Sequence, residues 1–161
     1  MADFAEEIER FLASFSPEET AVSRHAFQAI LAGPPAIVPD LPEALGRPAA
    51  DLEAAVGRLT ERGTLALDPL TERIVGVRGL SLTETDHRLR LAGRQLYAWC
   101  AVDAVGIPLA LGAEARVESR CHRCGVPLVL QVKGGVVVEG PEGMVIWAVE
   151  RDLSRSLRAH T

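Results

Sequence analysis

The sequence predicts an α+β protein. A winged-helix-like helical N-terminal lobe should be followed by a small, mostly antiparallel sheet and one apolar helix that accompanies it. Two observations support this class. Apolar residues recur at helical spacing as far as Arg62, whereas much of the second half alternates polar and apolar residues as half-buried strands do. The change of period predicts two units, residues 1–79 and residues 80–161.

The first unit contains the expected helices. Their segments are residues 3–15, Pro17–Ala32, Pro42–Leu45 and Ala49–Arg62. Ser16, Pro17 and Glu19 supply the capping hydroxyl, first-turn proline and third-position glutamate that typically start a helix. Gly33 and Gly63 stand where the second and fourth helices should end.

A hairpin is expected after the last of these helices. Leu65–Leu67 and Ile74–Val77 are short apolar runs that flank the polar turn Asp68–Glu72. The order of helix, turn, helix and hairpin is that of a winged helix. Winged helices often bind DNA, but a fold does not fix a function.

Charge argues against DNA binding. The candidate recognition helix sets Asp51, Glu53 and Glu61 against Arg58 and Arg62, and the whole chain has a formal net charge of -5. We therefore expect no nucleic-acid partner and interpret the first unit as a scaffold lobe that packs against the rest.

Composition predicts a reduced, cytoplasmic protein. Acidic residues near the N-terminus occupy the place of the basic start and apolar core of a signal peptide, and no apolar run reaches the length of a membrane span. Three cysteines are an odd number and a poor basis for a disulfide framework.

The second unit is predicted to consist mainly of strands. The expected strands are His87–Leu91, Ala115–Ser119, Val126–Val132 and Met144–Val149. Cys121–Gly125 should form a turn between two of them. Residues 95–111 form an apolar segment that we expect to be a helix, which Pro108 kinks or ends.

This apolar segment contains the most informative pair of residues, Cys100 and Asp103. At a separation of three, both side chains lie on one helical face. A thiolate is a nucleophile and a soft metal ligand, and a carboxyl in apolar surroundings tends to keep its proton. The alternative is structural: a cysteine that packs as a small hydrophobe and an aspartate at a helix edge.

The chain resembles the alkylmercury (organomercurial) lyase family from about Leu41 to Val132. The central motif is Leu96–Asp103, which reads LYAWCAVD against a family pattern close to LYAWCALD. Further matching segments are Ala44–Pro48, Arg73–Gly76, Gly79–Leu82, His87–Arg88 and Ala115–Ser119.

The resemblance implies protonolysis of a carbon–mercury bond. In this family two cysteine thiolates hold the metal of an organomercury cation, and an aspartate relays a proton to the carbon. Cys100 matches the first catalytic cysteine and Asp103 matches the aspartate. Tyr97 and Trp99 flank the thiol and are expected to form walls of the pocket. No resident cofactor is required; the expected partner is a small organometallic substrate or a soft metal ion.

The chain departs from the family pattern near its end. The second catalytic cysteine of the family falls in a segment that resembles residues 152–160, where the candidate positions are Arg158 and Ala159. No cysteine follows Cys124 in the sequence. Either this part of the site is lost or another thiol replaces it.

The remaining cysteines form a C-x-x-C-G turn. Cys121 matches a family cysteine regarded as structural, and Cys124 is an addition. Together with Cys100 they form a candidate set of ligands for mercury or zinc, to which His122 or His160 would add. The alternative is a plain turn with two reduced thiols.

Three functions follow from these observations. The first is an organomercurial lyase-like enzyme that uses Cys100 and Asp103. The second is a non-catalytic protein on the same fold that binds or senses zinc, copper or mercury. The third, a winged-helix regulator, is disfavoured by the charge of the chain.

Overall fold

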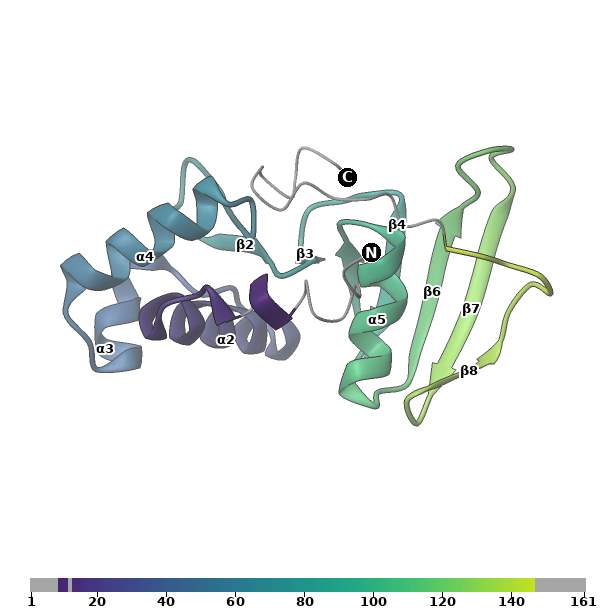
Figure 1. Ribbon diagram of the computed structural model, residues 1–161, viewed down its shortest axis with the longest axis horizontal. Helices are drawn as coiled ribbons and strands as arrows, with labels where there is room; N and C mark the ends of the chain where they lie inside the picture. Colours follow the sequence, from purple (N-terminus) through teal and green to yellow (C-terminus); the bar gives the residue numbers. More distant parts are fainter. Residues whose placement is uncertain (1–8, 12, 147–161) are drawn as a thin grey trace.

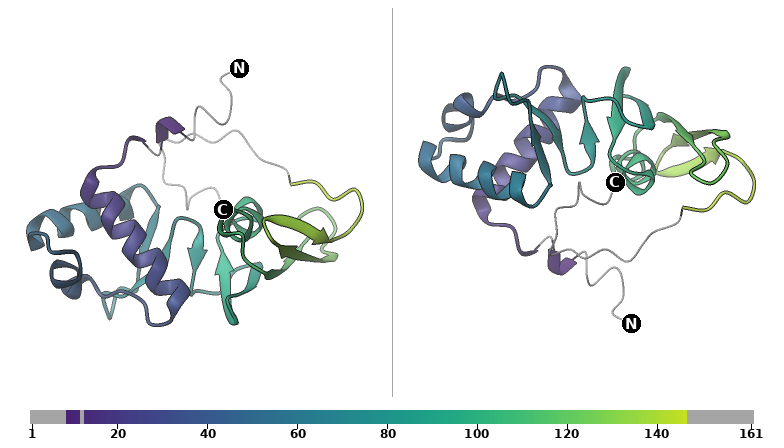
Figure 2. Two further views of the ribbon diagram at one scale, coloured as in Figure 1. Left: turned by 90° about the horizontal axis from the view of Figure 1, so that it is seen from below. Right: turned by 90° about the horizontal axis from the view of Figure 1, so that it is seen from above.

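A computed structural model describes residues 9–11 and 13–146 of the chain. Helices α2, α3 and α4 gather at one end, and an antiparallel sheet extends from them to the other end, with α5 packed against it (Figure 1). Figure 2 shows α5 end-on beside the sheet, separate from the group of helices that includes α2. The predicted mixture of helices and antiparallel sheet is therefore confirmed.

The helices and strands alternate little along the chain. The helices are α2 (Pro17–Ala32), the 3-10 helix η1 (Val38–Asp40), α3 (Leu41–Leu45), α4 (Ala49–Glu61) and α5 (Ala101–Leu111). The strands are β1 (Leu65–Leu67), β2 (Ile74–Val77), β3 (Leu80–Ser81), β4 (His87–Leu91), β5 (Arg94–Ala98), β6 (Ala115–Arg120), β7 (Pro127–Lys133) and β8 (Val136–Glu139).

One sheet joins all the strands of the described part. Their order is β1-β2-β3-β5-β4-β6-β7-β8, and every pair is antiparallel. Strand β3 pairs with β2 on one side and with β5 on the other, so the sheet continues across residues 79 and 80. The division into two units at this point, and the comparison with a winged helix, stay predictions.

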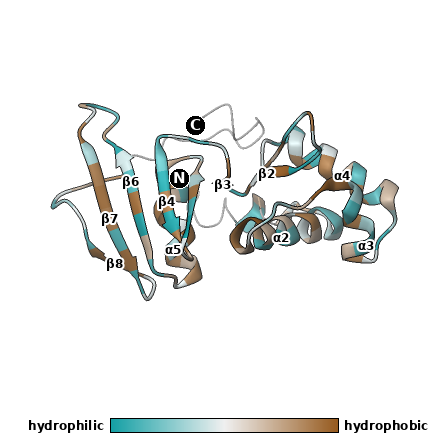
Figure 3. Ribbon diagram, turned by 180° about the vertical axis from the view of Figure 1, so that it is seen from behind, coloured by the Kyte–Doolittle hydropathy of each residue, from teal (hydrophilic) through white to brown (hydrophobic). Residues whose placement is uncertain are grey.

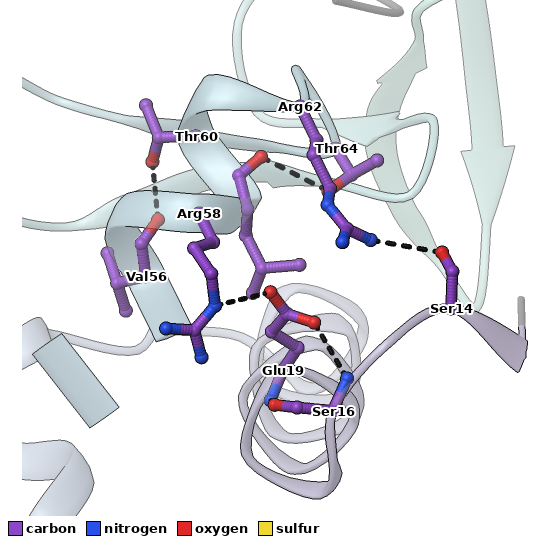
Figure 4. A network of polar contacts seen from close by, with 9 residues as sticks. Ser14, Ser16, Glu19, Val56, Arg58, Thr60, Arg62 and Thr64 are labelled. Atoms are coloured by element: carbon purple, nitrogen blue, oxygen red, sulfur yellow. Dashed lines mark hydrogen bonds and ion pairs between the residues drawn. The ribbon is translucent and has the colours of Figure 1, made fainter. Parts of the chain in front are cut away.

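Helix α2 begins as its sequence predicts. The Ser16 hydroxyl accepts a hydrogen bond from the Glu19 N–H at 3.1 Å, and the Glu19 carboxylate accepts one from the Ser16 N–H at 2.7 Å. Glu19 is 1% exposed and also accepts a hydrogen bond from Arg58 Nε at 2.8 Å (Figure 4). This carboxylate therefore joins the start of α2 to α4.

The core of the sheet consists of rows of apolar residues that cross the strands. One row runs through Leu96, Leu89, Val117 and Leu130 on four neighbouring strands, and all four are buried. Polar residues alternate with them along β4 and β6, as the hydropathy colouring in Figure 3 shows. Helix α5 covers this region by contacts with β3, β4, β5, β6 and β7.

The expected helix over residues 95–111 is wrong in its first part. Arg94–Ala98 is strand β5, paired with His87–Leu91 through a tight turn in which Ala92 and Gly93 have φ of 52° and 75°. Helix α5 starts only at Ala101 and continues past Pro108 to Leu111. The apolar run conceals this change because a buried strand and a buried helix look alike over a few residues.

Two further predictions concern the ends of the chain. Met144–Ile146 forms no strand, and the last strand of the described part is Val136–Glu139, which the sequence did not predict. Residues 147–149 of the expected strand lie outside the described residues, as does most of the expected helix over residues 3–15. Within the described part, no helix combines the length and apolar character needed to cross a membrane.

Candidate active site

Cys100 occupies the junction between strand β5 and helix α5. It is the N-cap residue of α5, with extended backbone angles, and its sulfur accepts a hydrogen bond from the Asp103 N–H at 3.4 Å. The Cys100 thiol in turn donates to Asp103 Oδ2 at 3.0 Å. The structure thus brings together the two predicted residues, through a capping interaction rather than along one helical face.

This position at the helix start affects both groups. The N–H groups of the first turn and the helix dipole stabilise negative charge there. The Cys100 sulfur and the Asp103 carboxylate both lie in this field. The arrangement can therefore hold an anionic sulfur next to a group that exchanges a proton with it.

Gly79 forms the surface against which the Asp103 carboxyl packs. A Cβ atom on Gly79 would lie 2.3 Å from Asp103 Cγ and 2.4 Å from Oδ1, distances that no real Cβ contact permits. Gly79 also has φ +86° and, with Arg78, forms the tight turn between β2 and β3. Its carbonyl accepts a hydrogen bond from the Trp99 N–H at 2.8 Å. Two requirements therefore select glycine at this position.

Gly76 makes room for the ring of Trp99 in a similar way. A Cβ atom on Gly76 would lie 2.9 Å from Trp99 Cζ2 and 3.2 Å from Nε1. The sequence predictions gave neither glycine a role. The signal for Gly79 was present as a glycine directly between two apolar runs, Ile74–Val77 and Leu80–Leu82.

A cavity of about 860 Å³ opens beside Trp99. Three acidic residues, Asp68, Glu84 and Asp86, line it together with Trp99 and His87. The expected wall residue Trp99 is therefore part of a cavity. Tyr97 is not among its lining residues and instead accepts a hydrogen bond from Gln95 Nε2 at 2.7 Å.

His87 lies between this cavity and strand β6. Its Nδ1 is 2.8 Å from Ser119 Oγ. Burial lowers the pKa of His87, and the charges of Asp86 and Asp103 act in the opposite direction. His87 is thus close enough to Asp103 to sense its charge.

Cys121 and Cys124 lie apart from this pair. Strands β5 and β6 are both antiparallel to β4, so both end at the same edge of the sheet. Each of the two strands has a residue aligned with His87 of β4. Cys100 and Cys121 each follow that residue by two positions. Two strand spacings, about 10 Å, separate them. Among residues 9–11 and 13–146, no group of three or more Cys, His, Asp or Glu side chains is placed to hold a metal ion. The three cysteines therefore do not form one shared site.

The turn after β6 has its own local chemistry. Backbone and thiol hydrogen bonds from Cys124, followed by the backbone of Arg123, lower the pKa of Cys121 below the ordinary thiol value. Cys124 is exposed and Cys121 is half-buried, and both are free thiols. The predicted ligand positions at Arg158, Ala159 and His160 lie outside the described residues.

Comparison with known proteins gives a consistent result. The chain is 31% identical over 136 residues to an alkylmercury lyase of Bacillus cereus, a match that covers 84% of the chain and 60% of that protein. It is 40% identical over 112 residues to an alkylmercury lyase of Pseudomonas putida, over 63% of the chain and 52% of the relative. The chain thus spans between half and two thirds of the length of these relatives.

A solved structure agrees with these sequence matches. The mercury-bound form of MerB2 superimposes with a TM-score of 0.87 at 29% identity, over 93% of this chain and 73% of that one. A family model described as alkylmercury lyase matches residues 80–160, which is half of the chain and includes Cys100 and Asp103. This chain belongs to the alkylmercury lyase family.

Proposed function

We propose that the protein cleaves carbon–mercury bonds by protonolysis, with Cys100 as the thiolate that binds mercury and Asp103 as the proton donor. The observation that supports this most is the hydrogen bond of 3.0 Å from the Cys100 thiol to Asp103 Oδ2. It provides a direct path for one proton between the two groups. Membership of the lyase family makes an organomercury cation the substrate class.

The first step forms the bond between sulfur and mercury. As Cys100 binds the organomercury cation, its S–H bond breaks and the proton passes to the Asp103 carboxylate. A soft thiolate is a good ligand for a soft metal ion. The negative charge of Asp68, Glu84 and Asp86 around the neighbouring cavity favours the approach of a cation.

The second step releases the hydrocarbon. The Asp103 carboxyl transfers its proton to the carbon, and the electron pair of the carbon–mercury bond becomes the new carbon–hydrogen bond. Mercury remains divalent on the Cys100 sulfur, so nothing is oxidised or reduced. The sum is an organomercury cation plus a thiol giving a hydrocarbon plus a thiolate-bound mercuric ion.

Regeneration of the enzyme requires further thiols. Cys100 is the one cysteine in a hydrogen bond with Asp103 among the described residues. We propose that two small-molecule thiols remove the mercuric ion as its bis-thiolate, which returns one proton to Cys100 and releases one to solvent. Turnover should therefore depend on the concentration of added thiol. The cytoplasmic location remains a prediction from the acidic N-terminal segment, the apolar run lengths and the cysteine count.

The direct test uses reduced protein with phenylmercury or methylmercury in excess thiol. We expect benzene or methane above the thiol-only background by headspace gas chromatography, and singly deuterated methane in heavy water. Cys100→Ser should abolish release, and Asp51→Asn, an exposed carboxylate on α4, should not. Mercury uptake without hydrocarbon would refute the lyase and support the non-catalytic alternative.

A further inference from the structure

We propose that Cys121 and Cys124 form a second metal site, which binds one soft ion such as the mercuric ion between two thiolates. The site is separate from Cys100 and does not depend on lyase activity. It lies in the turn between β6 and β7, at the same sheet edge as Cys100 (Figure 1).

The backbone of this turn is closed at both ends. The Cys121 N–H donates to the Val126 carbonyl at 2.8 Å, and the Gly125 N–H donates to the Cys121 carbonyl at 2.8 Å. Gly125 has φ +71°, which lets the chain reverse immediately after Cys124. The flanking pairs of β6 and β7 then hold the two ends in register. The turn therefore presents its cysteines from a fixed frame.

Within this frame the two cysteines belong to one closed turn. Cys121 and Cys124 are the first and fourth residues of a turn that the Gly125 N–H closes onto the Cys121 carbonyl, so both side chains project from one short loop of backbone. Two cysteines separated by two residues have the spacing that paired thiolate ligands take in protein metal sites. The backbone that carries the two ligands is thus fixed before an ion arrives.

The number of ligands selects the kind of ion. Zinc in structural sites takes four ligands in tetrahedral geometry. The described residues provide two thiols here and no third metal-binding side chain grouped with them. Soft ions such as mercuric ion accept two thiolates in a linear arrangement, and thiolates prefer soft metals. The pair therefore suits a two-coordinate soft ion.

Access and charge balance are compatible with binding. Cys124 is exposed, and Cys121 is half-buried at the edge of the turn. Binding one mercuric ion breaks two S–H bonds, forms two mercury–sulfur bonds and releases two protons to solvent. No electron is transferred, so neither an oxidant nor a reductant is needed.

The experiment uses Cys100→Ser protein, which retains the turn and lacks the lyase thiol. Mercuric chloride is added in the presence of excess glutathione, and native mass spectrometry and the thiolate-to-mercury absorption band are recorded. We expect one ion per chain. A further Cys124→Ala change should weaken retention by at least about 100-fold, because the chelate is lost. Arg123→Lys, at an exposed position of the same turn, is the matched control and should bind as the parent does.

A second measurement avoids any effect of the turn substitutions on folding. Mercuric ion should also protect Cys121 and Cys124 from iodoacetamide in Cys100→Ser protein. This measurement tests mercury binding at the turn without substituting any residue of the turn. Equal retention with and without Cys124, or one zinc ion held as firmly as mercury, would overturn the proposal. Because Cys100 is absent, failure here leaves the lyase proposal unaffected, and failure of the lyase assay leaves this site unaffected.

Discussion

The two cysteine regions of this protein lie at the same sheet edge but differ in how the chain surrounds them. Cys100 is followed by a helix, and its partner Asp103 rests against the backbone of Gly79 from another part of the sheet. Cys121 and Cys124 are held only by a local turn between two paired strands. A site assembled from distant segments constrains the position of a proton donor, whereas a local turn is sufficient to bring two ligands together.

The largest expected effect is at Asp103, the proposed proton donor. Asp103→Asn keeps the shape of the side chain but removes its ability to deliver a proton, so release of hydrocarbon should fall by at least about 100-fold. Binding of mercuric ion at the Cys121–Cys124 turn should be unchanged, which separates the two regions. Single-turnover gas chromatography measures the first quantity and mass spectrometry the second. If Asp103→Asn released hydrocarbon as fast as the parent protein, another group would be the proton donor.

A smaller effect is expected at Gly79. In Gly79→Ala the new Cβ would occupy the space of the Asp103 carboxyl, and the residue would have to keep φ +86°. The carboxyl must then move, and the rate of the chemical step should fall by at least about 10-fold, since misplacement of a reacting group is costly. Single-turnover rates, together with thermal unfolding, test this.

A matched substitution separates the two requirements at Gly79, its positive φ and its contact with Asp103. Gly93→Ala introduces a methyl group at another glycine with positive φ, where no atom lies within 4 Å of the new Cβ. It should share the backbone strain of Gly79→Ala but leave the chemical step intact. If both variants lose the same rate, strain rather than displacement of Asp103 would be the cause.

A third change affects stability far from either cysteine region. Glu19→Gln removes a buried carboxylate that accepts hydrogen bonds from Ser16 and Arg58 and should lower the free energy of unfolding by about 1–2 kcal/mol. Chemical denaturation at neutral pH measures it. Mercury binding per folded chain should not change, because neither site touches this carboxylate.

The contribution of Glu19 to the free energy of unfolding can also be measured in the unaltered protein, by lowering the pH. Although burial raises the pKa of Glu19, hydrogen bonds from Ser16 and Arg58 and nearby arginine charge lower it overall. The native pKa is therefore below the unfolded value, about 4.3. The stabilisation is complete above that pH and is lost as the pH falls through the native pKa. Glu19→Gln should flatten this part of the stability curve; an unchanged slope would contradict the assignment.

The smallest effect is expected at Gly76. In Gly76→Ala the added methyl group would lie 2.9 Å from the edge of the Trp99 ring. A ring edge can shift more easily than a carboxyl fixed in a helix cap, so we expect a loss of only about threefold in the rate. Tryptophan fluorescence should report the altered ring environment. An effect larger than that of Gly79→Ala would show that Trp99, and not Asp103, limits the reaction.

The sequence was most informative where local signals are strong. Ser16, Pro17 and Glu19 predicted the start of α2 correctly because a capping box involves only residues within one turn. Cys100 and Asp103 were correctly expected to meet, because a separation of three brings them together both within a helix and at its cap. Their surroundings depend on pairing between distant strands and could not be predicted from spacing.

The incorrect predictions have physical reasons as well. Residues 94–98 were assigned to a helix because their apolar character continues into α5, and only pairing with β4 makes them a strand. Val136–Glu139 was missed because its run of three valines and a glutamate lacks the polar–apolar alternation that marks a half-buried strand. Gly79 was not singled out because the need for glycine arises from Asp103, more than twenty positions later in the chain.

The continuity of the sheet through β2 and β3 limits how the Cys100–Asp103 pair can be moved to a fragment or to another protein. A fragment that starts at residue 80, where the family model begins, would retain Cys100 and Asp103 but lose the glycine backbone behind the carboxyl. Building the Cys100–Asp103 pair into another scaffold would therefore require the turn with Gly79 between two strands as well as the motif itself.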